Sequence, residues 1–217
     1  MPISAPRPRG ARLLTAFSPT LERTVRAFNY QGLWQWVRLE TDPQITSFCE
    51  HPVRLGKADD ARLIDFWVQR GDAEELLVLD RDRATDKISE SLDGIALRLV
   101  PAAELAAAGT WITHWLRMLP VITATRGLVP KSRLRAAMKR VREPVAFSLV
   151  EHEVAVGGPS LGRGAIFELL RMGRLLAPSL HSLAPSLYAT IEPARSFAPR
   201  PPPAHLRRAI TRWRCKA

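Results

Sequence analysis

The sequence predicts an α/β protein with a mixed sheet flanked by helices. Over residues 21–107, segments with helical periodicity alternate with short apolar segments of strand character. The segment Glu75–Asp80 (ELLVLD) is apolar enough for a central strand, which is covered on both faces. This alternation is typical of a sheet that packs against helices. The length of 217 residues allows one large domain or two small ones.

The elements of the first half are predicted from apolar periodicity and from the residues that interrupt it. A helix is predicted at Leu21–Glu40, and it ends at Asp42-Pro43 because a residue that precedes proline avoids the α-helical conformation. The other predictions for this half are strands at Ile45–Leu55 (interrupted at His51-Pro52), Ala61–Gln69, Glu75–Asp80 and Ala96–Val100, and helices at Ala84–Asp93, 102–109 and Thr110–Leu119.

The second half is predicted to be mainly helical. Its elements are helices at Lys131–Arg142, Val145–Ala155 and Leu161–Met172, and a short strand at 174–177. Ser160 is a suitable N-cap for the third helix, and Gly173 a suitable residue to end it. Three helices followed by glycine and a strand are the outline of a winged helix-turn-helix domain. The alternative is a small helical cap that does not contact DNA.

Changes in composition, and the prolines and glycines that interrupt regular structure, divide the chain into four predicted parts. Prolines and arginines alternate at the N-terminus, and the C-terminus combines a proline run with seven basic residues and no acids. The parts are a flexible basic arm at 1–20, the mixed α/β domain at 21–125, a winged-helix-like domain at 126–193 and a Pro-rich basic tail at 194–217.

Charge is distributed unevenly along the chain. The formal net charge is +11, yet the segment Arg38–Glu104 holds fifteen acids and nine bases, a net of −6, so the rest of the chain has a net charge of +17. Basic flanks around an acidic middle favour contact with a polyanion, of which nucleic acid is the commonest. The alternative is an arginine-rich composition without a polyanion partner.

The number of cysteines and the hydropathy of the sequence indicate in which cellular compartment the protein is expected. The two cysteines, Cys49 and Cys215, are too few for a disulfide scaffold. No apolar run approaches the roughly 18–20 residues of a membrane span, and no apolar stretch of a secretory signal follows the basic N-terminus. We expect a bacterial cytoplasmic protein, without a membrane partner, that associates with the nucleoid when it is on DNA.

Asp65 is the residue that first suggests an enzymatic site. It stands inside an apolar strand (Ile64-Asp65-Phe66), and a buried carboxylate needs a partner or a metal ion. Metal-dependent nucleases need two or three carboxylates around a divalent cation and a lysine or similar group near the phosphate. The alternative is a surface-facing residue on an edge strand.

Several short motifs resemble the N-terminal domain of TnsA, the endonuclease subunit of heteromeric transposases. The matching residues are Glu40-Thr41-Asp42-Pro43, Phe48, His51-Pro52 and Asp65-Phe66, in the family's order and at similar spacing. The resemblance covers residues 28–100 closely and 130–190 loosely. It implies a restriction-endonuclease-like fold for the first domain, followed by a winged-helix-like segment.

The departures from the TnsA pattern lie at its catalytic positions. The family's Glu-Val-Lys strand falls on Val78-Leu79-Asp80, and its first catalytic acid falls near Gly32, which cannot bind a metal. Of the expected catalytic residues only Asp65 is present. Glu40, Glu75 or Asp80 are the acids that could replace the others. Without the full set, metal-assisted hydrolysis lacks its ligands and its charge stabilisation.

The resemblance implies a DNA transposition protein with a degenerate nuclease domain. Its implied partners are DNA, a DDE-type transposase and an AAA+ transposition regulator. The expected phosphate contacts are the basic residues on the polar sides of the predicted C-terminal helices: Arg133, Arg135, Lys139, Arg163, Arg171 and Arg174.

Two other functions remain open on the sequence. The first is an active nuclease with relocated acids, which would use Mg²⁺ or Mn²⁺ bound through Asp65. The second is a non-catalytic protein-interaction module that has no role on DNA.

Overall fold

The computed structural model describes residues 2, 7, 9–55, 62–80, 91–155, 158–182 and 189–194, with the backbone alone at Leu55 and Arg62. No helix in these ranges combines the length and the apolar character needed to cross a membrane. The predicted tail, apart from Ala194, and Cys215 lie outside the described residues.

Contacts divide the chain into two compact units. Of the described residues, those within Met1–Leu39 and Gln44–Ala106 form unit 1, and those within Glu40–Pro43 and Ala107–Ala198 form unit 2. The division after Ala106 comes earlier than the boundary predicted near residue 125. The reason is that the long helix after Gly109 packs against a later helix of unit 2.

The core of unit 1 is a five-stranded sheet with the order β3-β6-β7-β9-β8. Its strands are β3 (Ile45–Glu50), β6 (Phe66–Arg70), β7 (Ala73–Leu79), β8 (Ser91–Leu92) and β9 (Ile95–Val100). β7 and β9 are parallel, and the other neighbouring pairs are antiparallel. The predicted mixed α/β sheet flanked by helices is therefore confirmed.

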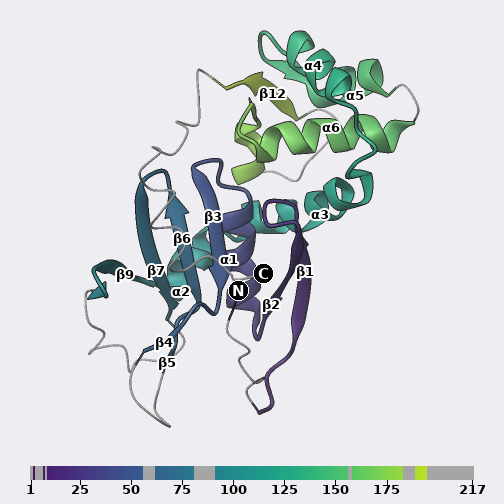
Figure 1. The fold of residues 1–217 in the computed structure, drawn as a ribbon. Coiled ribbons are helices and arrows are strands. Elements are labelled where there is room, and N and C mark those ends of the chain that lie inside the picture. The colour runs from purple at the N-terminus through teal and green to yellow at the C-terminus, as the bar shows by residue number, and fades with distance from the viewer. Residues whose placement is uncertain are drawn as a thin grey trace. The chain divides into compact units, whose positions relative to one another are not determined.

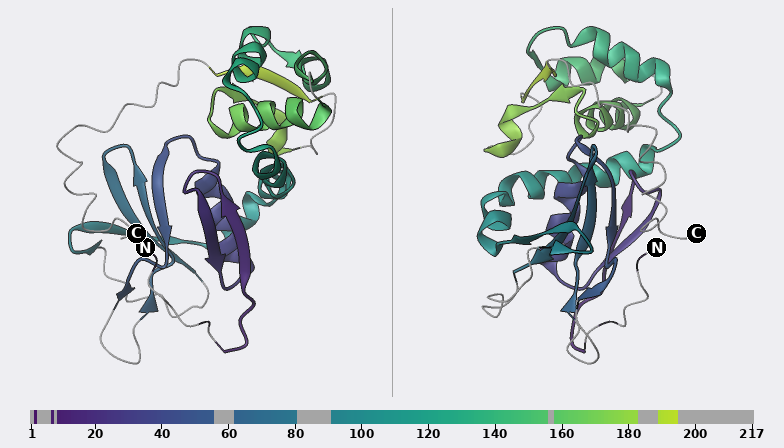
Figure 2. Two further views of the ribbon diagram at one scale, coloured as in Figure 1. Left: turned by 45° about the vertical axis from the view of Figure 1, so that its right-hand side comes forward. Right: turned by 60° about the vertical axis from the view of Figure 1, so that its left-hand side comes forward.

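β7 is the central strand of this sheet, as its apolar sequence predicts. All four residues from Leu76 to Leu79 are buried. Leu76 and Val78 pack with Cys49, Ile64 and Trp67 in one hydrophobic cluster. The helices of unit 1 are α1 (Tyr30–Glu40), of which Tyr30–Leu39 belong to the unit, and α2 (Ala102–Ala107), of which Ala102–Ala106 do. α1 lies between the sheet and a β-hairpin (Figures 1 and 2).

That hairpin corrects two predictions for the N-terminal region. β1 (Leu14–Ser18) falls within the predicted arm at 1–20, and β2 (Arg23–Ala27) falls within the predicted helix at Leu21–Glu40. Val25 and Ala27 are buried while Thr24 and Arg26 are exposed, which is the alternation of a strand. The helix itself begins later, because the Asn29 side chain accepts the backbone N–H of Gly32 and caps it there.

The expected strand at Ile45–Leu55 is interrupted at His51-Pro52 as predicted, and its second part is β4 (Arg54–Leu55). β4 pairs with β5 (Arg62–Leu63), so the predicted strand at Ala61–Gln69 is also divided, at Ile64-Asp65. The predicted helix at Ala84–Asp93 lies mostly outside the described residues. Its end is not helical: Ser91–Leu92 form β8, and Asp93 and Gly94 form a turn with φ of 51° and 80°.

Unit 2 combines four helices with a small antiparallel sheet among its described residues. In chain order its elements are α3 (Gly109–Thr125), α4 (Lys131–Arg140), β10 (Val145–Ala146), α5 (Phe147–Val154), α6 (Pro159–Arg171), β11 (Leu175–Leu176), a 3₁₀ helix (Pro178–His181) and β12 (Thr190–Pro193). The strand order is β10-β12-β11. α6 contacts α3, α4 and α5.

Most predicted element ends in unit 2 shift slightly, and one shifts substantially. α3 continues through Pro120 to Thr125, although a helix end was predicted at Leu119. Proline removes one helical hydrogen bond, but Met118 and Ile122 are buried on either side of it, so tertiary packing holds the helix together. Pro120 itself is exposed.

α6 begins at Pro159 after Gly158, rather than with Ser160 as its cap. Proline suits the first helical position because its missing N–H has no partner there. Gly173 ends this helix with a φ of 64°, as predicted, and β11 follows at the expected place. The first two residues of the helix predicted at Val145–Ala155 form β10 instead, and the helix itself begins at Phe147.

An ion pair joins the hairpin to the edge of the sheet in unit 1. Both terminal nitrogens of Arg23 donate to the carboxylate of Glu50, each at 2.6 Å, and the Glu50 side chain is 2% exposed. The hydrogen bonds that Arg23 donates to Glu50 raise the pKa of Arg23 above its ordinary value. Burial, followed by the nearby Glu50 charge, raises the pKa of Cys49 to about 11, so this thiol stays protonated at neutral pH.

Replacement of Arg23 by methionine is expected to lower the free energy of unfolding by about 3 kcal/mol, because Glu50 then keeps a buried charge without its partner. Urea denaturation followed by circular dichroism measures the change. Arg26→Met, on the exposed face of the same strand, is the matched control and should change stability by less than about 0.5 kcal/mol. Equal stability of the two variants would contradict a structural role for the pair.

Candidate nucleic-acid interface

Asp65 is buried and is used by the fold. Asp65 is 3% exposed, and its Oδ2 atom accepts a hydrogen bond from the backbone N–H of Leu79 at 2.8 Å. Its backbone N–H donates to the carbonyl of Leu77, and its carbonyl accepts from His51. Asp65 stands in the irregular step between β5 and β6, where its side chain takes the place of a ladder hydrogen bond to β7. The sequence predicts that a buried Asp65 needs a partner, and the backbone N–H of Leu79 is that partner.

Glu75 and Asp80 are placed at opposite ends of β7. Glu75 pairs with Val68 near the start of the strand, whereas Asp80 follows its last residue. Five residues of strand span about 16 Å at roughly 3.3 Å per residue. Metal ligands lie about 2–2.6 Å from their ion, so these two carboxylates cannot bind the same one. Asp80 lies at the C-terminal end of β7, where Asp65 also accepts the N–H of Leu79.

Glu40 belongs to unit 2 and is held by an arginine. The Glu40 side chain is fully buried, and the Arg171 guanidinium of α6 reaches it at 3.2 Å. Arg171 also makes two hydrogen bonds to Glu168, at 2.7 and 2.8 Å. Burial lowers the pKa of Arg171, but Glu168 and then Glu40 outweigh it, and the pKa is raised overall. This cluster is a structural ion-pair network.

Two of the departures from the TnsA pattern, Val78 and Gly32, occupy packed positions. Val78 is fully buried in the hydrophobic cluster of the sheet, and a side chain at Gly32 would lie 3.3 Å from Cβ of Ala27 on β2. Within the ranges that the structure describes, no three His, Cys, Asp or Glu residues form a group that could hold a metal ion.

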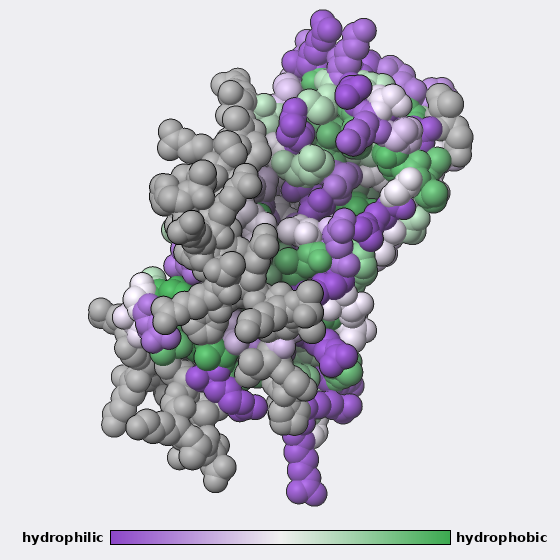
Figure 3. Space-filling model, viewed as in Figure 1, coloured by the Kyte–Doolittle hydropathy of each residue, from purple (hydrophilic) through white to green (hydrophobic). Residues whose placement is uncertain are grey.

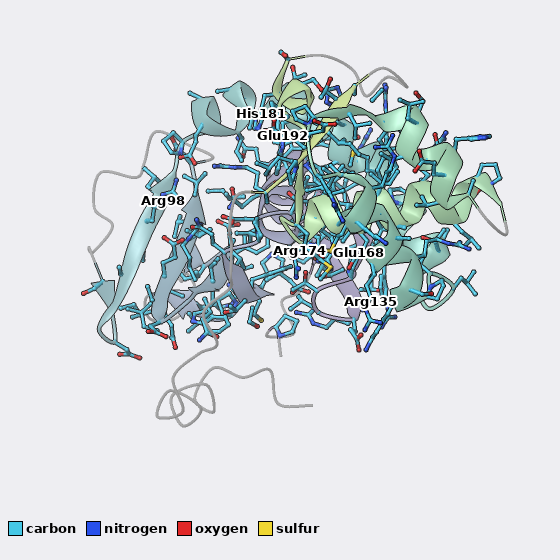
Figure 4. The ribbon with its side chains drawn as sticks, turned by 90° about the horizontal axis from the view of Figure 1, so that it is seen from above. Arg98, Arg135, Glu168, Arg174, His181 and Glu192 are labelled. Carbon is cyan, nitrogen blue, oxygen red and sulfur yellow. The ribbon has the colours of Figure 1, made fainter. Side chains whose placement is uncertain are left out.

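The predicted phosphate contacts separate into two classes. Arg135, Lys139 and Arg174 are exposed, and Figure 4 shows where Arg135 and Arg174 lie in unit 2. Arg133 is half-buried, and Arg163 is exposed but donates its Nε to Glu151 at 2.7 Å. Arg171 is only 14% exposed and is engaged with acids, so it does not present its charge to solvent.

Exposed cations form a row along α4. Lys131, Arg135 and Lys139 are all exposed at a spacing of four residues, which places them on one side of the helix. The rise of 1.5 Å per residue separates successive members by about 6 Å. No hydrogen bond or ion pair within the described part of the chain engages these three side chains. We call them the α4 row.

The surroundings of the α4 row are also basic. The segment 131–142 has six basic residues and no acid. Of its other cations, Arg140 pairs with Glu153 at 2.7 Å, whereas Arg142 is exposed just after the helix. On the face of the molecule shown in Figure 3, hydrophilic residues of unit 2 lie among hydrophobic ones. This side of the helix is therefore suited to an anionic partner.

Lys131 is a member of the row that the sequence-based site did not include. The four-residue spacing to Arg135 and Lys139 was the signal that could have found it. Arg133, which the sequence also predicts as a phosphate contact, is half-buried and lies outside this row.

Comparisons with protein-family models and with curated proteins find no match to this chain. The resemblance to TnsA therefore stays a prediction from short motifs.

Replacement of Asp65 by alanine is expected to destabilise the protein by about 2 kcal/mol, because it removes a buried acceptor of the Leu79 N–H. Asp65→Asn keeps an oxygen that can accept this hydrogen bond and should cost clearly less. Urea denaturation of both variants measures the difference. If the alanine variant is as stable as the unmodified chain, the carboxylate has no structural role of this kind.

Proposed function

We propose that this protein binds duplex DNA through the α4 row, without cleaving it. The observation that carries the proposal is the row itself: Lys131, Arg135 and Lys139 are exposed at helical spacing in a segment with no acid. Lysine and arginine that neutralise phosphates release counterions from DNA, and this is the main source of sequence-independent affinity.

The element order of unit 2 supports a winged-helix-like domain. Helix, strand, helix, helix and two strands follow one another from α4 to β12, and β12 pairs with both β10 and β11. This is the order of a helix-turn-helix domain with a β-wing. In such domains the helix at the position of α6 enters the major groove.

α6 is nevertheless poorly suited to read bases. Seven of its thirteen residues are buried, and its exposed residues are Pro159, Ser160 and Arg163 at its first turns. The proposed contact therefore lies on α4 and addresses phosphates. Phosphate contacts position a protein on DNA but do not specify sequence, so we expect weak sequence preference.

A role in DNA transposition rests on the resemblance to TnsA. We propose a TnsA-like accessory protein, with a transposase and an AAA+ regulator as partners, whose restriction-endonuclease-like domain has lost cleavage. Two observations support the loss: Asp65 serves the backbone of β7, and the position of the family's glutamate is the buried Val78.

The DNA proposal is tested by fluorescence anisotropy with a labelled 20-base-pair duplex between 50 and 200 mM NaCl. The combined variant Lys131→Gln, Arg135→Gln and Lys139→Gln should bind more weakly. If each residue meets one phosphate, the slope of log K against log salt should become shallower by about 3, at about 0.9 per lost contact.

A charge-matched control removes three cations from unit 1 instead, as Arg26→Gln, Arg70→Gln and Arg98→Gln. It should keep most of the affinity and the salt slope. Equal losses in both variants would attribute binding to net charge rather than to the α4 row. No binding by the unmodified protein at 50 mM NaCl would favour the protein-interaction module.

The loss of cleavage is tested with supercoiled plasmid in Mg²⁺ or Mn²⁺. We expect no nicking above a metal-free control, because Asp65 is engaged and no neighbouring lysine is supplied by β7. Metal-dependent nicking that disappears in Asp65→Asn, a variant expected to stay folded, would establish the active nuclease.

A further inference from the structure

We propose that unit 2 has a binding site for a small amphiphilic anion, a molecule with an aromatic or acyl body and one acidic group. The site is a cavity of about 430 Å³ between α3, α6, the start of α5 and β12. Its volume lies in the range of roughly 300–1,000 Å³ that is usual for small-molecule sites. It is separate from the α4 row.

The interior of the cavity is apolar. Met118 and Phe147 line it, together with Phe167, Leu170, Leu180 and Ile191, and all six are buried. The rings of Phe147 and Phe167 lie 5.7 Å apart, tilted by 34°, and form one wall. Burial of an apolar body against these side chains removes apolar surface from water and is favourable.

The charged residues lie at the solvent end of the cavity. Arg117 and Arg163 line it, and among the lining residues that the structure describes these two are exposed. No polar contact engages the Arg117 guanidinium within the described part of the chain. Arg163 uses its Nε for Glu151, and its two terminal nitrogens make no hydrogen bond there.

An apolar interior with guanidinium groups at its mouth selects the chemistry of the occupant. A neutral apolar molecule would leave the arginines unused, and a small hydrophilic anion would leave the interior unfilled. A carboxylate or sulfonate on an apolar body satisfies both, since the arginine guanidinium donates charge-assisted hydrogen bonds to oxyanions. The cavity thus matches such a molecule in two ways: its interior matches the apolar body, and its arginines match the acidic group.

The experiment uses 1-anilinonaphthalene-8-sulfonate, an aromatic anion, with the full chain, and follows its fluorescence. We expect one site, for which octanoate competes. Arg117→Gln should weaken this probe about tenfold but leave the uncharged analogue N-phenyl-1-naphthylamine nearly unaffected. Ala177→Trp, which fills the cavity from its lining, should abolish binding of both probes.

Arg135→Gln on α4 is the matched control and should bind the sulfonate as the unmodified chain does. Circular dichroism checks that the cavity-filling variant is folded; if it is not, Val121→Phe fills the cavity from α3. The proposal is overturned if the sulfonate binds a folded, filled variant unchanged, if Arg135→Gln weakens it as much as Arg117→Gln, or if no saturable site exists.

Discussion

Burial of negative charge is the constraint on which the two units of this chain depend. Glu40, Glu50 and Asp65 are each at most 3% exposed, and a buried carboxylate is tolerated only with an internal donor. Each has one: Arg171, Arg23 and the backbone of Leu79, respectively. Two of these carboxylates, Glu40 and Asp65, are also candidate metal ligands in the sequence, and in the fold each stabilises its own unit through an internal partner.

Four strands of the central sheet, β3, β6, β7 and β9, were predictable because they are marked locally, whereas β8 falls in a segment predicted to be helical. The apolar run of β7 and the break at His51-Pro52 are readable without a structure. The hairpin was not, because β1 lies in a region rich in proline and arginine, and its pairing with β2 is a tertiary contact. The passage of α3 through Pro120 likewise depends on packing that sequence periodicity does not report.

The candidate site was predictable to the extent that it depends on helical spacing. Basic residues four apart in a segment without acids indicate an exposed cationic face, and α4 has one. The roles of Arg163 and Arg171 were not predictable, because they depend on partners elsewhere in the chain. Glu40 precedes Arg171 by 131 positions, and nothing local to either residue indicates the other.

Two glycines of unit 2 limit how far this sequence can diverge while keeping its fold. A Cβ at Gly164 would overlap the side chain of Thr125, and one at Gly173 would lie 2.6 Å from Pro43, at a φ that already disfavours other residues. A side chain at either position therefore requires a compensating change at Thr125 or Pro43. Glycine at both, together with the Glu40–Arg171 pair, is the pattern by which distant relatives of this unit would be recognised.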